Sequence, residues 1–316
     1  MDICCIDNDM FYRYQECIDE LEPIRAYGQF FNGKIDAPDE DKIQLAKNCE
    51  VVFFGTTYLA NEIIEKLPKV KILQFMGTGV ANYVDIDFCK RKNIAVLNVE
   101  DYGSNSVAEY AVALMFASIR NIPTADARMK KEIWTSDGLE GGEIEGSIVG
   151  VLGTGNIGSK VAKKLVSLGA QRVLAFDAYK NHELIDKYGI EYMSMEEIFE
   201  VCDIISVHLK YTNDTYKIVS GKMIKKMKKN AYLINTARAE LVDYEALEEA
   251  LRTKSIKGAA IDVFYEEPLS DYSMCKMENI IATSHIGFFS RRAKRNLLKN
   301  AVASAISEIE KQNRCL

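Results

Sequence analysis

Three ionisable residues in the second half of the chain, Arg238, Glu267 and His285, stand just after apolar runs, where a strand would end. An arginine fork can bind a carboxylate through two parallel N–H bonds. A histidine, whose charge changes near neutral pH, can donate a proton to a carbonyl oxygen, and a neighbouring carboxylate favours its charged form. These residue types suit the reduction of a 2-oxo acid by a hydride, with the histidine as the base in the opposite direction.

A glycine fingerprint near the middle of the chain predicts where the hydride donor binds. Gly153, Gly155 and Gly158 follow the apolar run Ser147–Leu152, and Asp177 stands nineteen residues after Gly158. The first glycine allows a tight turn, the second lets the backbone approach a pyrophosphate, and the third lets a helix pack on the strand. The pyrophosphate would rest on a helix N-terminus, where free N–H groups favour negative charge. The alternative is a glycine-rich turn that holds no ligand.

The acid that follows this fingerprint indicates which dinucleotide to expect. The carboxylate of Asp177 can bind a ribose 2′-hydroxyl and would repel a 2′-phosphate, which favours NAD over NADP.

Each of these three candidate catalytic residues has an ordinary structural explanation when it is taken alone. Arg238 could form a surface ion pair, Glu267 could end a turn, and His285 could be a core histidine. In an open α/β sheet, however, ligands lie outside the carboxyl ends of the strands. The presence of all three residues at that edge of a nucleotide-binding sheet favours a catalytic role over three separate structural ones.

Composition argues against several other classes of protein. The chain has 316 residues, 48% of them apolar and 27% charged, so about two domains with substantial cores are expected. A formal net charge of −6 argues against a nucleic-acid partner. The apolar runs are too short to span a membrane, and no metal motif joins the eight cysteines and three histidines. Because no secretory signal begins the chain, we expect a cytoplasmic protein with reduced thiols.

Apolar runs alternate with helical patterns, as they do in βαβ units with a parallel sheet. In the first hundred residues the expected strands are Asp2–Ile6, Val51–Gly55, Ile72–Met76 and Ile94–Asn98. A helix is expected to begin at Ser106, which has capping-box spacing to Glu109. Six later strands, the number in a complete Rossmann sheet, are the fingerprint strand and Arg172–Asp177, Asp203–His208, Ala231–Asn235, Gly258–Val263 and Ile280–Ser284.

A last helix, expected over Arg291–Lys311, comes after the strands that complete the cofactor domain. We therefore infer that it returns to the first domain. The predicted fold is α/β with two Rossmann-like domains. A doubly wound, parallel-sheet NAD-binding domain at residues 101–286 is inserted into a flavodoxin-like substrate domain formed by residues 1–100 and 287–316.

The chain resembles the D-isomer-specific 2-hydroxyacid dehydrogenase family over nearly its whole length. The segments that carry the resemblance are Ile148–Gly158, Tyr232–Arg238, Ala260–Pro268 and Ser284–Gly287. The resemblance implies an NAD-dependent interconversion of a small 2-oxo acid and its D-2-hydroxy acid. It assigns Arg238 to the substrate carboxylate, His285 to acid–base catalysis and Glu267 to pairing with His285.

The resemblance also implies residues around the two ligands. Asp262 would orient the nicotinamide carboxamide, and His208 has either a cofactor role or a structural one. The expected cofactor-binding residues are Gly153, Gly155, Asn156, Ile157, Gly158, Asp177, His208, Thr212, Thr236, Ala237 and Asp262. The expected substrate-binding residues are Thr78 and Gly79 through their backbone N–H groups, Tyr102, and Arg238.

The identity of the acid stays open. Tyr102 and Phe288 resemble the D-lactate-like branch of the family, whereas Gly77–Gly79 and Glu267–Pro268 are more similar to its glycerate, hydroxypyruvate and phosphoglycerate branches. A small unphosphorylated acid is our hypothesis, because no obvious phosphate-binding cation is found among the candidate pocket residues Thr57, Tyr58, Met76, Tyr102 and Phe288.

A different class of function also stays open. Transcriptional corepressors that share this fold are NAD(H)-sensing scaffolds. They often keep the same three candidate catalytic residues, so the fold does not by itself settle function. Members of the family are usually dimers joined through the cofactor domain. The resemblance therefore implies a homodimer, with the helix Ser106–Ile119 as a candidate contact.

Overall fold

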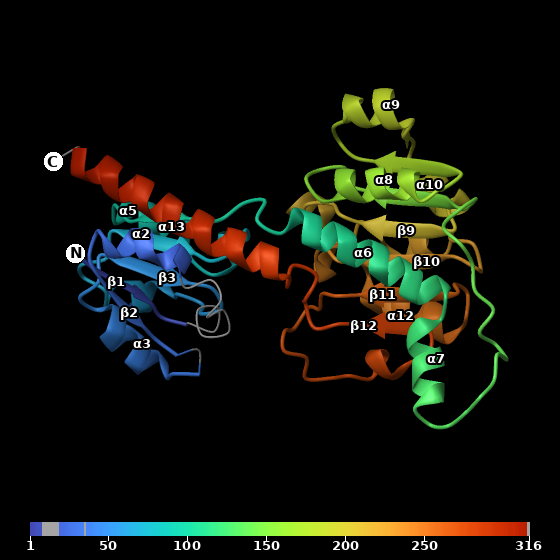
Figure 1. The fold of residues 1–316 in the computed structure, drawn as a ribbon, viewed down its shortest axis with the longest axis horizontal. Helices are drawn as coiled ribbons and strands as arrows, with labels where there is room; N and C mark the ends of the chain where they lie inside the picture. The colour runs from blue at the N-terminus through green and yellow to red at the C-terminus, as the bar shows by residue number, and fades with distance from the viewer. Residues whose placement is uncertain (8–18, 35, 315–316) are drawn as a thin grey trace. The chain divides into compact units, whose positions relative to one another are not determined.

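The structure, a computed structural model, describes residues 1–7, 19–34 and 36–314. The chain forms two compact units (Figure 1). The first unit comprises Met1–Gly103 and Phe289–Leu316, and the second comprises Ser104–Phe288. Each unit has a parallel sheet with helices on both faces, which confirms the predicted fold class.

The sheet of the first unit has the strand order β2-β1-β3-β4-β5, the flavodoxin-like order. Its strands are β1 Asp2–Cys5, β2 Gln29–Asn32, β3 Val51–Phe54, β4 Ile72–Phe75 and β5 Ala95–Leu97. Strands β3 and β4 are buried at every residue, so β3 appears in the sequence as a continuous apolar run and β4 as a run interrupted only by Gln74. The edge strand β2 is missing from the expected set because its four residues are exposed or only partly buried.

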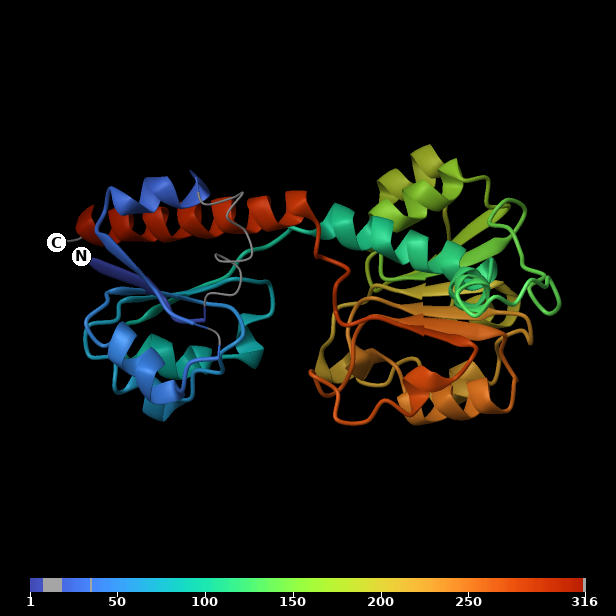
Figure 2. The same ribbon diagram turned by 60° about the horizontal axis from the view of Figure 1, so that its bottom comes forward.

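Helices cover both faces of this sheet. One face packs against α2 Glu22–Arg25 and the long α13 Arg291–Arg314, which carries the second segment of the unit. The opposite face packs against α3 Asp39–Ala46, α4 Asn61–Ile64 and α5 Ile86–Arg91. Figure 2 shows α13, in red, and a blue helix beside it on one side of the sheet, with further blue and teal helices on the other. A short 3-10 turn, η2 Val80–Asn82, follows β4.

The sheet of the second unit has the order β12-β11-β10-β9-β6-β7-β8. Relative to β6, this is the Rossmann order 3-2-1-4-5-6 with one further strand at the edge. Its strands are β6 Ile148–Leu152, β7 Arg172–Phe176, β8 Glu191–Tyr192, β9 Ile204–Val207, β10 Tyr232–Asn235, β11 Gly258–Ile261 and β12 Ile280–Ala282. The prediction of six strands misses β8, an edge strand of two residues.

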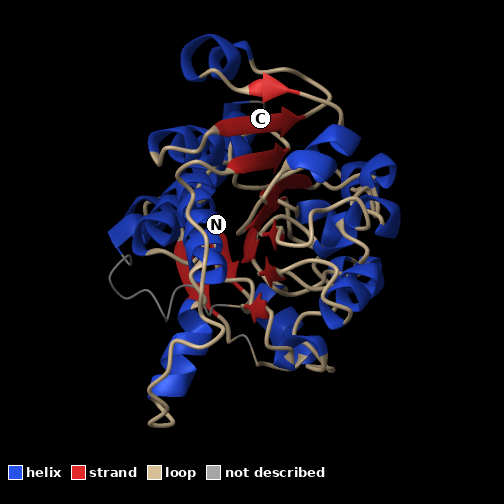
Figure 3. Cartoon of the chain, turned by 90° about the vertical axis from the view of Figure 1, so that its right-hand side faces the viewer, coloured by secondary structure: helices blue, strands red, loops and turns tan. Residues whose placement is uncertain are grey.

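Two layers of helices enclose this second sheet. Helices α6 Ser104–Ile119, α8 Gly158–Ser167 and α9 His182–Tyr188 pack on one face. Helices α10 Met195–Val201, α11 Gly221–Ile224 and α12 Tyr244–Arg252 pack on the other. Figure 3, with strands in red and helices in blue, shows helices on both sides of the strands. The remaining elements are α7 Ile122–Met129 and the 3-10 turns η3 Asn213–Thr215, η4 Ala239–Leu241 and η5 Met274–Lys276.

The expected capping box at the start of α6 does not form. The helix begins two residues earlier, at Ser104, so Ser106 lies within it. Its hydroxyl donates a hydrogen bond of 3.0 Å to the carbonyl oxygen of Gly287. The side chain of Ser106 therefore links α6 to the loop after β12 instead of capping the helix.

The described residues contain neither a candidate membrane span nor a candidate metal cluster. No helix there is both long and apolar enough to cross a membrane. No group of three or more His, Cys, Asp or Glu side chains there is arranged to hold a metal ion. Six cysteines are described and all are free thiols. Cys17 and Cys315 lie outside the described residues.

Candidate active site

Four neighbouring strands of the second unit end at the same edge of the sheet. Leu152 of β6 pairs with Val207 of β9, Val207 pairs with Asn235 of β10, and Asn235 pairs with Ile261 of β11. The segments that follow these strands contain most of the sequence-predicted site residues. Their common position is the carboxyl edge, where ligands bind in this class of sheet.

The glycine turn after β6 has the shape that a pyrophosphate site requires. Gly153 has a φ of +93°, and a Cβ there would lie 2.6 Å from the backbone of His208. A Cβ on Gly158 would lie 1.8 Å from the carbonyl oxygen of Gly153, so neither position accepts a side chain. A Cβ on Gly155, by contrast, would have no described atom within 4 Å. The turn is thus closed towards the protein at Gly153 and Gly158 and open at Gly155.

The turn leads directly into α8, whose first residue is Gly158. No side chain caps this helix at Ile157, and Asn156 is exposed. The first N–H groups of an α-helix have no partner within the helix. The start of α8 can therefore bind an anion through its backbone.

Asp177, immediately after β7, lies beside the glycine turn. Its Oδ2 atom accepts hydrogen bonds from the backbone N–H of Thr154 at 2.6 Å and from the Thr154 hydroxyl at 3.2 Å. Its Oδ1 atom accepts one bond, of 3.2 Å, from the backbone N–H of Tyr179. The carboxylate is therefore fixed at the end of β7, where the sequence places the ribose.

Two buried polar atoms at this edge have no hydrogen-bond partner among the described residues: Nδ1 of His208 and Oγ1 of Thr236. The other ring nitrogen of His208, Nε2, lies 2.8 Å from the hydroxyl of Ser206. Burial lowers the pKa of His208 to about 3, so the ring is neutral at physiological pH. Because buried polar groups are normally hydrogen-bonded, both atoms have unused hydrogen-bonding capacity.

Two other predicted cofactor residues have backbone groups that are already engaged. The N–H of Ala237 donates to Oδ1 of Asn235 at 3.1 Å. The N–H of Thr212 donates to the hydroxyl of Thr215 at 2.7 Å, and the residue itself is exposed. Any contact of Thr212 or Ala237 with a ligand would have to use other atoms.

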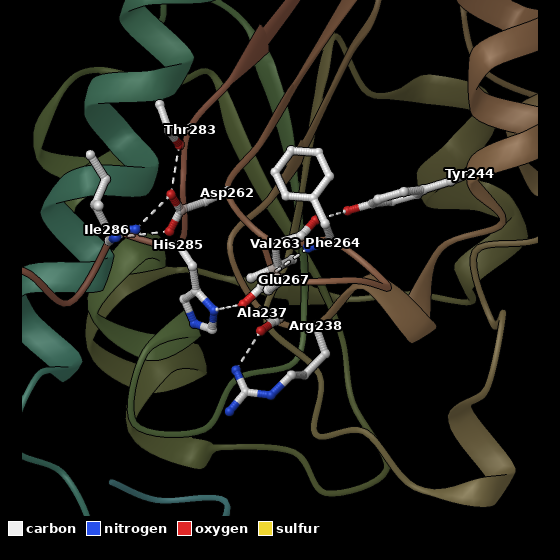
Figure 4. Close-up of polar contacts among 11 residues, drawn as sticks. Ala237, Arg238, Tyr244, Asp262, Val263, Phe264, Glu267, Thr283, His285 and Ile286 are labelled. Atoms are coloured by element: carbon white, nitrogen blue, oxygen red, sulfur yellow. Dashed lines mark hydrogen bonds and ion pairs between the residues drawn. The ribbon is translucent and has the colours of Figure 1, made fainter. Parts of the chain in front are cut away.

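Asp262, which follows β11, is only 1% exposed and accepts three hydrogen bonds. Its Oδ1 atom accepts from the hydroxyl of Thr283 at 2.6 Å and from the N–H of Ile286 at 2.9 Å, and its Oδ2 atom accepts from the N–H of Gly287 at 2.8 Å. These contacts hold both sides of His285, which has a φ of +54° (Figure 4). The direct effect of Asp262 in this structure is thus to position the histidine loop.

Arg238, Glu267 and His285 lie together in the second unit (Figure 4). Nδ1 of His285 lies 2.6 Å from Oε2 of Glu267, while Oε1 of Glu267 accepts from the N–H of Phe264 at 2.9 Å. The guanidinium of Arg238 donates one bond, of 2.7 Å, to the carbonyl oxygen of Ala237. The side chains of His285 and Glu267 are 38% and 37% exposed, so the pair faces an open edge and can meet a ligand.

The electrostatics of this group keep Glu267 ionised. Its partial burial acts to raise its pKa, but the hydrogen bond and charge of His285, the N–H of Phe264 and the charge of Arg238 together lower the pKa of Glu267 below its ordinary value. A carboxylate at Nδ1 leaves Nε2 of His285 as the ring nitrogen that can exchange a proton with a ligand.

Two supporting residues of this group are absent from the sequence prediction. The side-chain amide of Asn235, which is fully buried, donates to the carbonyl oxygen of Arg238 at 3.0 Å and to the hydroxyl of Tyr244 at 3.2 Å. That hydroxyl donates in turn to the carbonyl oxygen of Val263 at 2.8 Å. These bonds join the turns after β10 and β11, which carry Arg238 and Glu267. Only the polarity of Asn235 within an apolar strand could have signalled this role.

The other predicted substrate residues, Thr78, Gly79 and Tyr102, belong to the first unit. The hydroxyl of Thr78 donates to the carbonyl oxygen of Val99 at 3.2 Å, and its own carbonyl accepts from Asn98 at 2.9 Å. The backbone N–H groups of Thr78 and Gly79 donate no hydrogen bond to any described residue. The carbonyl oxygen of Tyr102 accepts from Asn296 of α13 at 3.4 Å.

Comparison with known proteins identifies the family. Residues 112–287, more than half of the chain, match the family model described as D-isomer specific 2-hydroxyacid dehydrogenase, NAD binding domain. The chain belongs to the D-isomer-specific 2-hydroxyacid dehydrogenase family. The second unit is accordingly the NAD-binding domain of a 2-hydroxyacid dehydrogenase family member, which confirms the resemblance and the predicted cofactor.

Proteins that are similar in sequence to this chain differ in length and have different names. The D-3-phosphoglycerate dehydrogenase of Methanocaldococcus jannaschii is 36% identical over 260 residues, which are 81% of this chain and 49% of that protein. The chain therefore spans about half the length of this dehydrogenase. The aromatic 2-oxoacid reductase of Clostridium sporogenes is 31% identical over 318 residues, covering 94% of this chain and 95% of that protein.

A solved structure supports the same membership of the 2-hydroxyacid dehydrogenase family. The D-lactate dehydrogenase of Escherichia coli, in its apo form, matches with a TM-score of 0.87 and 25% sequence identity. The match covers 99% of this chain and 97% of that one.

Proposed function

We propose that the protein is an oxidoreductase that uses NADH to reduce a 2-oxo acid to its D-2-hydroxy acid, and that it catalyses the reverse reaction with NAD. The observation that carries this proposal is the contact of 2.6 Å between His285 and Glu267 at the carboxyl edge of an NAD-binding domain, with Arg238 beside it. An acid–base group next to a carboxylate-binding group is what this reaction needs from a protein.

The three residues divide the work in this proposal. Arg238 binds the substrate carboxylate through its planar fork and so orients the 2-oxo group. His285 donates a proton from Nε2 to the carbonyl oxygen, which becomes the hydroxyl, and the neutral ring then regains a proton from water. Glu267 remains ionised and favours the charged imidazole before the transfer. NADH, when bound, supplies the hydride that the carbonyl carbon receives.

The cofactor site of this proposal uses the groups at the carboxyl edge that have unused hydrogen-bonding capacity. Gly155 and the start of α8 would hold the pyrophosphate, and Asp177 would bind the ribose hydroxyls. Nδ1 of His208 and Oγ1 of Thr236 gain the partners that they lack within the described residues. Because Asp177 would repel a 2′-phosphate, we propose a preference for NAD over NADP.

For the substrate, we propose a small unphosphorylated 2-oxo acid. The aromatic 2-oxoacid reductase that aligns over 94% of this chain supports an acid without a phosphate group. In the first unit, Thr78 and Gly79 are proposed to bind the substrate carboxylate through their backbone N–H groups, and Tyr102 is proposed to contact the substrate side chain.

The proposal is tested by following NADH consumption with a panel of 2-oxo acids that includes pyruvate, glyoxylate, hydroxypyruvate, phenylpyruvate and 3-phosphohydroxypyruvate. We expect turnover with at least one unphosphorylated acid and formation of the D product. Better use of 3-phosphohydroxypyruvate than of the other acids would contradict the proposed substrate class. NADH binding with no turnover, together with cofactor-dependent binding of a protein partner, would favour the corepressor-like scaffold.

We further propose that the protein is a homodimer. The apolar side chains of α6 are mostly buried in the core of the second unit itself, so α7 and the segment after it are the better candidate for the contact. Helix α7 has no buried residue, and large apolar side chains are exposed on and just after it: Ile122, Met129, Ile133 and Trp134. Figure 1 shows α7 and the loop that follows it, in green, extending away from the sheet of the second unit.

Light scattering of the protein and of a Trp134→Ser/Met129→Ser variant tests the proposed homodimer. We expect the wild type to be a dimer and the double substitution to weaken it.

A further inference from the structure

A chain of hydrogen bonds connects the edge strand β8 to the carboxylate of Asp177. The backbone N–H of Asn181 donates to the hydroxyl of Tyr192 at 2.9 Å, and that hydroxyl donates to Oγ1 of Thr154 at 2.7 Å. Oγ1 of Thr154 then donates to Oδ2 of Asp177 at 3.2 Å. Each hydroxyl accepts one bond and donates one, so every donor in the chain points towards the carboxylate.

The direction of this chain decides what the hydroxyl of Thr154 can do. Because it accepts from Tyr192, its own hydrogen is directed to Asp177, where it adds to the 2.6 Å bond from the Thr154 backbone N–H. Hydrogen bonds in series polarise one another, which strengthens the last bond of the series. Thr154 is only 5% exposed, so water does not readily replace either partner.

The two oxygens of Asp177 are consequently unequal. Oδ2 receives both bonds from Thr154, while among the described residues Oδ1 receives only the N–H of Tyr179 at 3.2 Å. A carboxylate oxygen can accept two hydrogen bonds. The arrangement leaves acceptor capacity on Oδ1 and prevents the carboxylate from rotating freely.

We propose that Tyr192 is a positioning residue for the cofactor. Acting through Thr154, it orients the Asp177 carboxylate so that Oδ1 accepts a hydrogen bond from the adenosine ribose of NAD, and it thereby strengthens the preference for a free 2′-hydroxyl over a 2′-phosphate. This inference rests on the proposed role of Asp177 as the ribose ligand. It adds a residue from a two-residue strand, nearly forty positions from the glycine turn, to the determinants of cofactor choice.

The substitution Tyr192→Phe removes only the hydroxyl and keeps the ring, which packs against the core of the second unit. Without that donor, the hydroxyl of Thr154 can turn away from Asp177, and the carboxylate is then held only by the backbone N–H groups of Thr154 and Tyr179. We expect NADH to bind about threefold to tenfold more weakly, the usual effect of losing one hydrogen bond. We expect NADPH binding to change less, so that the ratio of the two dissociation constants moves towards one.

The measurement is a fluorescence titration of the intact protein with NADH and with NADPH, without substrate. Tyr188→Phe is the matched control, because it makes the same change in the same unit at a ring whose recorded contact is with Lys163. Two variants of Thr154 test the path: Thr154→Val should reproduce the effect of Tyr192→Phe, and Thr154→Ser should retain wild-type binding. In the Thr154→Val background, Tyr192→Phe should have no further effect, since both variants break the same chain.

Two results would overturn the proposal. One is wild-type affinity for NADH and NADPH in Tyr192→Phe. The other is additive losses in the double variant, which would show that Tyr192 acts independently of Thr154. Asp177→Ala separates this failure from failure of the ribose assignment: if it binds NADH as tightly as wild type, Asp177 is not the ribose ligand. Thermal unfolding of each variant identifies any loss of binding that comes from misfolding.

Discussion

His285 is joined through Nδ1 to Oε2 of Glu267 at 2.6 Å, and the opposite oxygen of Glu267 is held by the N–H of Phe264 at 2.9 Å. The carboxylate therefore bridges the histidine loop and the turn after β11. Asp262 fixes the same loop from the other side through the N–H groups of Ile286 and Gly287. Two carboxylates thus orient His285: Glu267 contacts the ring, and Asp262 holds the loop. Nε2 is the ring nitrogen that can still exchange a proton with a ligand.

The substitution Arg238→Ala should act mainly on substrate binding. It removes the proposed fork for the substrate carboxylate, while the glycine turn and Asp177 stay intact. We expect KM for the 2-oxo acid to rise about a hundredfold, as charged hydrogen bonds of this kind contribute roughly 1.5–3 kcal/mol. Arg238→Lys should recover only part of the loss, because lysine keeps the charge without the bidentate geometry. Steady-state kinetics at saturating NADH measure both, and an unchanged KM in Arg238→Ala would refute the assignment.

The substitution Glu267→Gln should change the pH dependence of the reaction. The lowered pKa of Glu267 means that it is ionised across the neutral range, where its charge favours the protonated imidazole. Without that charge, the rate of reduction should decline at a lower pH than in the wild type. The profile of kcat/KM against pH measures this shift. Glu266→Gln is the matched control, and equal profiles for the two variants would contradict the role of Glu267.

His208 should make the protein sensitive to acid. Its ordinary pKa of 6.5 is lowered by burial to about 3 in the folded state, so the unfolded chain binds a proton that the folded chain does not. Above pH 6.5 protonation of His208 therefore does not lower the free energy of unfolding, and as the pH falls from 6.5 towards 3 that free energy decreases. Between about pH 7 and about pH 5 the wild type should lose up to about 2 kcal/mol more than His208→Gln. Urea unfolding at both values measures the difference, and equal losses would show that His208 is not buried as a neutral ring.

The central parts of both sheets were predictable because their strands are buried on both faces and form apolar runs bounded by polar turns. The edge strands β2 and β8 were not, because one is largely exposed and the other has only two residues. The omission of β8 also left Tyr192 out of the predicted site. Tyr192, on β8, contacts Thr154 across 38 positions of sequence, and nothing in the local pattern indicates that partnership.

The positions of Arg238, Glu267 and His285 just after strands were predictable from the sequence, but the residues that support them were not. Asn235 and Tyr244 join two turns through hydrogen bonds that depend on strand order. The left-handed backbone of His285 has no sequence signal, since glycine usually occupies that conformation. Such contacts arise from tertiary packing and become visible only when β9, β10 and β11 are placed side by side.

Asp7 illustrates a further contact of this type and gives a prediction for the first unit. Its carboxylate, 4% exposed, accepts from the N–H groups of Gly55, Thr56 and Thr57 at 2.7–3.0 Å. Asp7→Ala leaves these groups unpaired, so we expect the free energy of unfolding to fall by about 3 kcal/mol. Hydrogen–deuterium exchange at residues 55–57 should accelerate strongly, and less so in Asp7→Asn, which keeps one acceptor oxygen. Unchanged exchange in Asp7→Ala would show that the carboxylate does not hold this loop.

The most direct test of the account is to compare wild type and His285→Ala in NADH-linked reduction of the best 2-oxo acid, with NADH affinity measured separately. We predict that kcat falls by about a hundredfold to ten-thousandfold, the usual loss on removing a general acid. The dissociation constant of NADH should stay unchanged, since no cofactor contact is assigned to the imidazole. Wild-type turnover in His285→Ala would contradict the assignment of this residue as the proton donor.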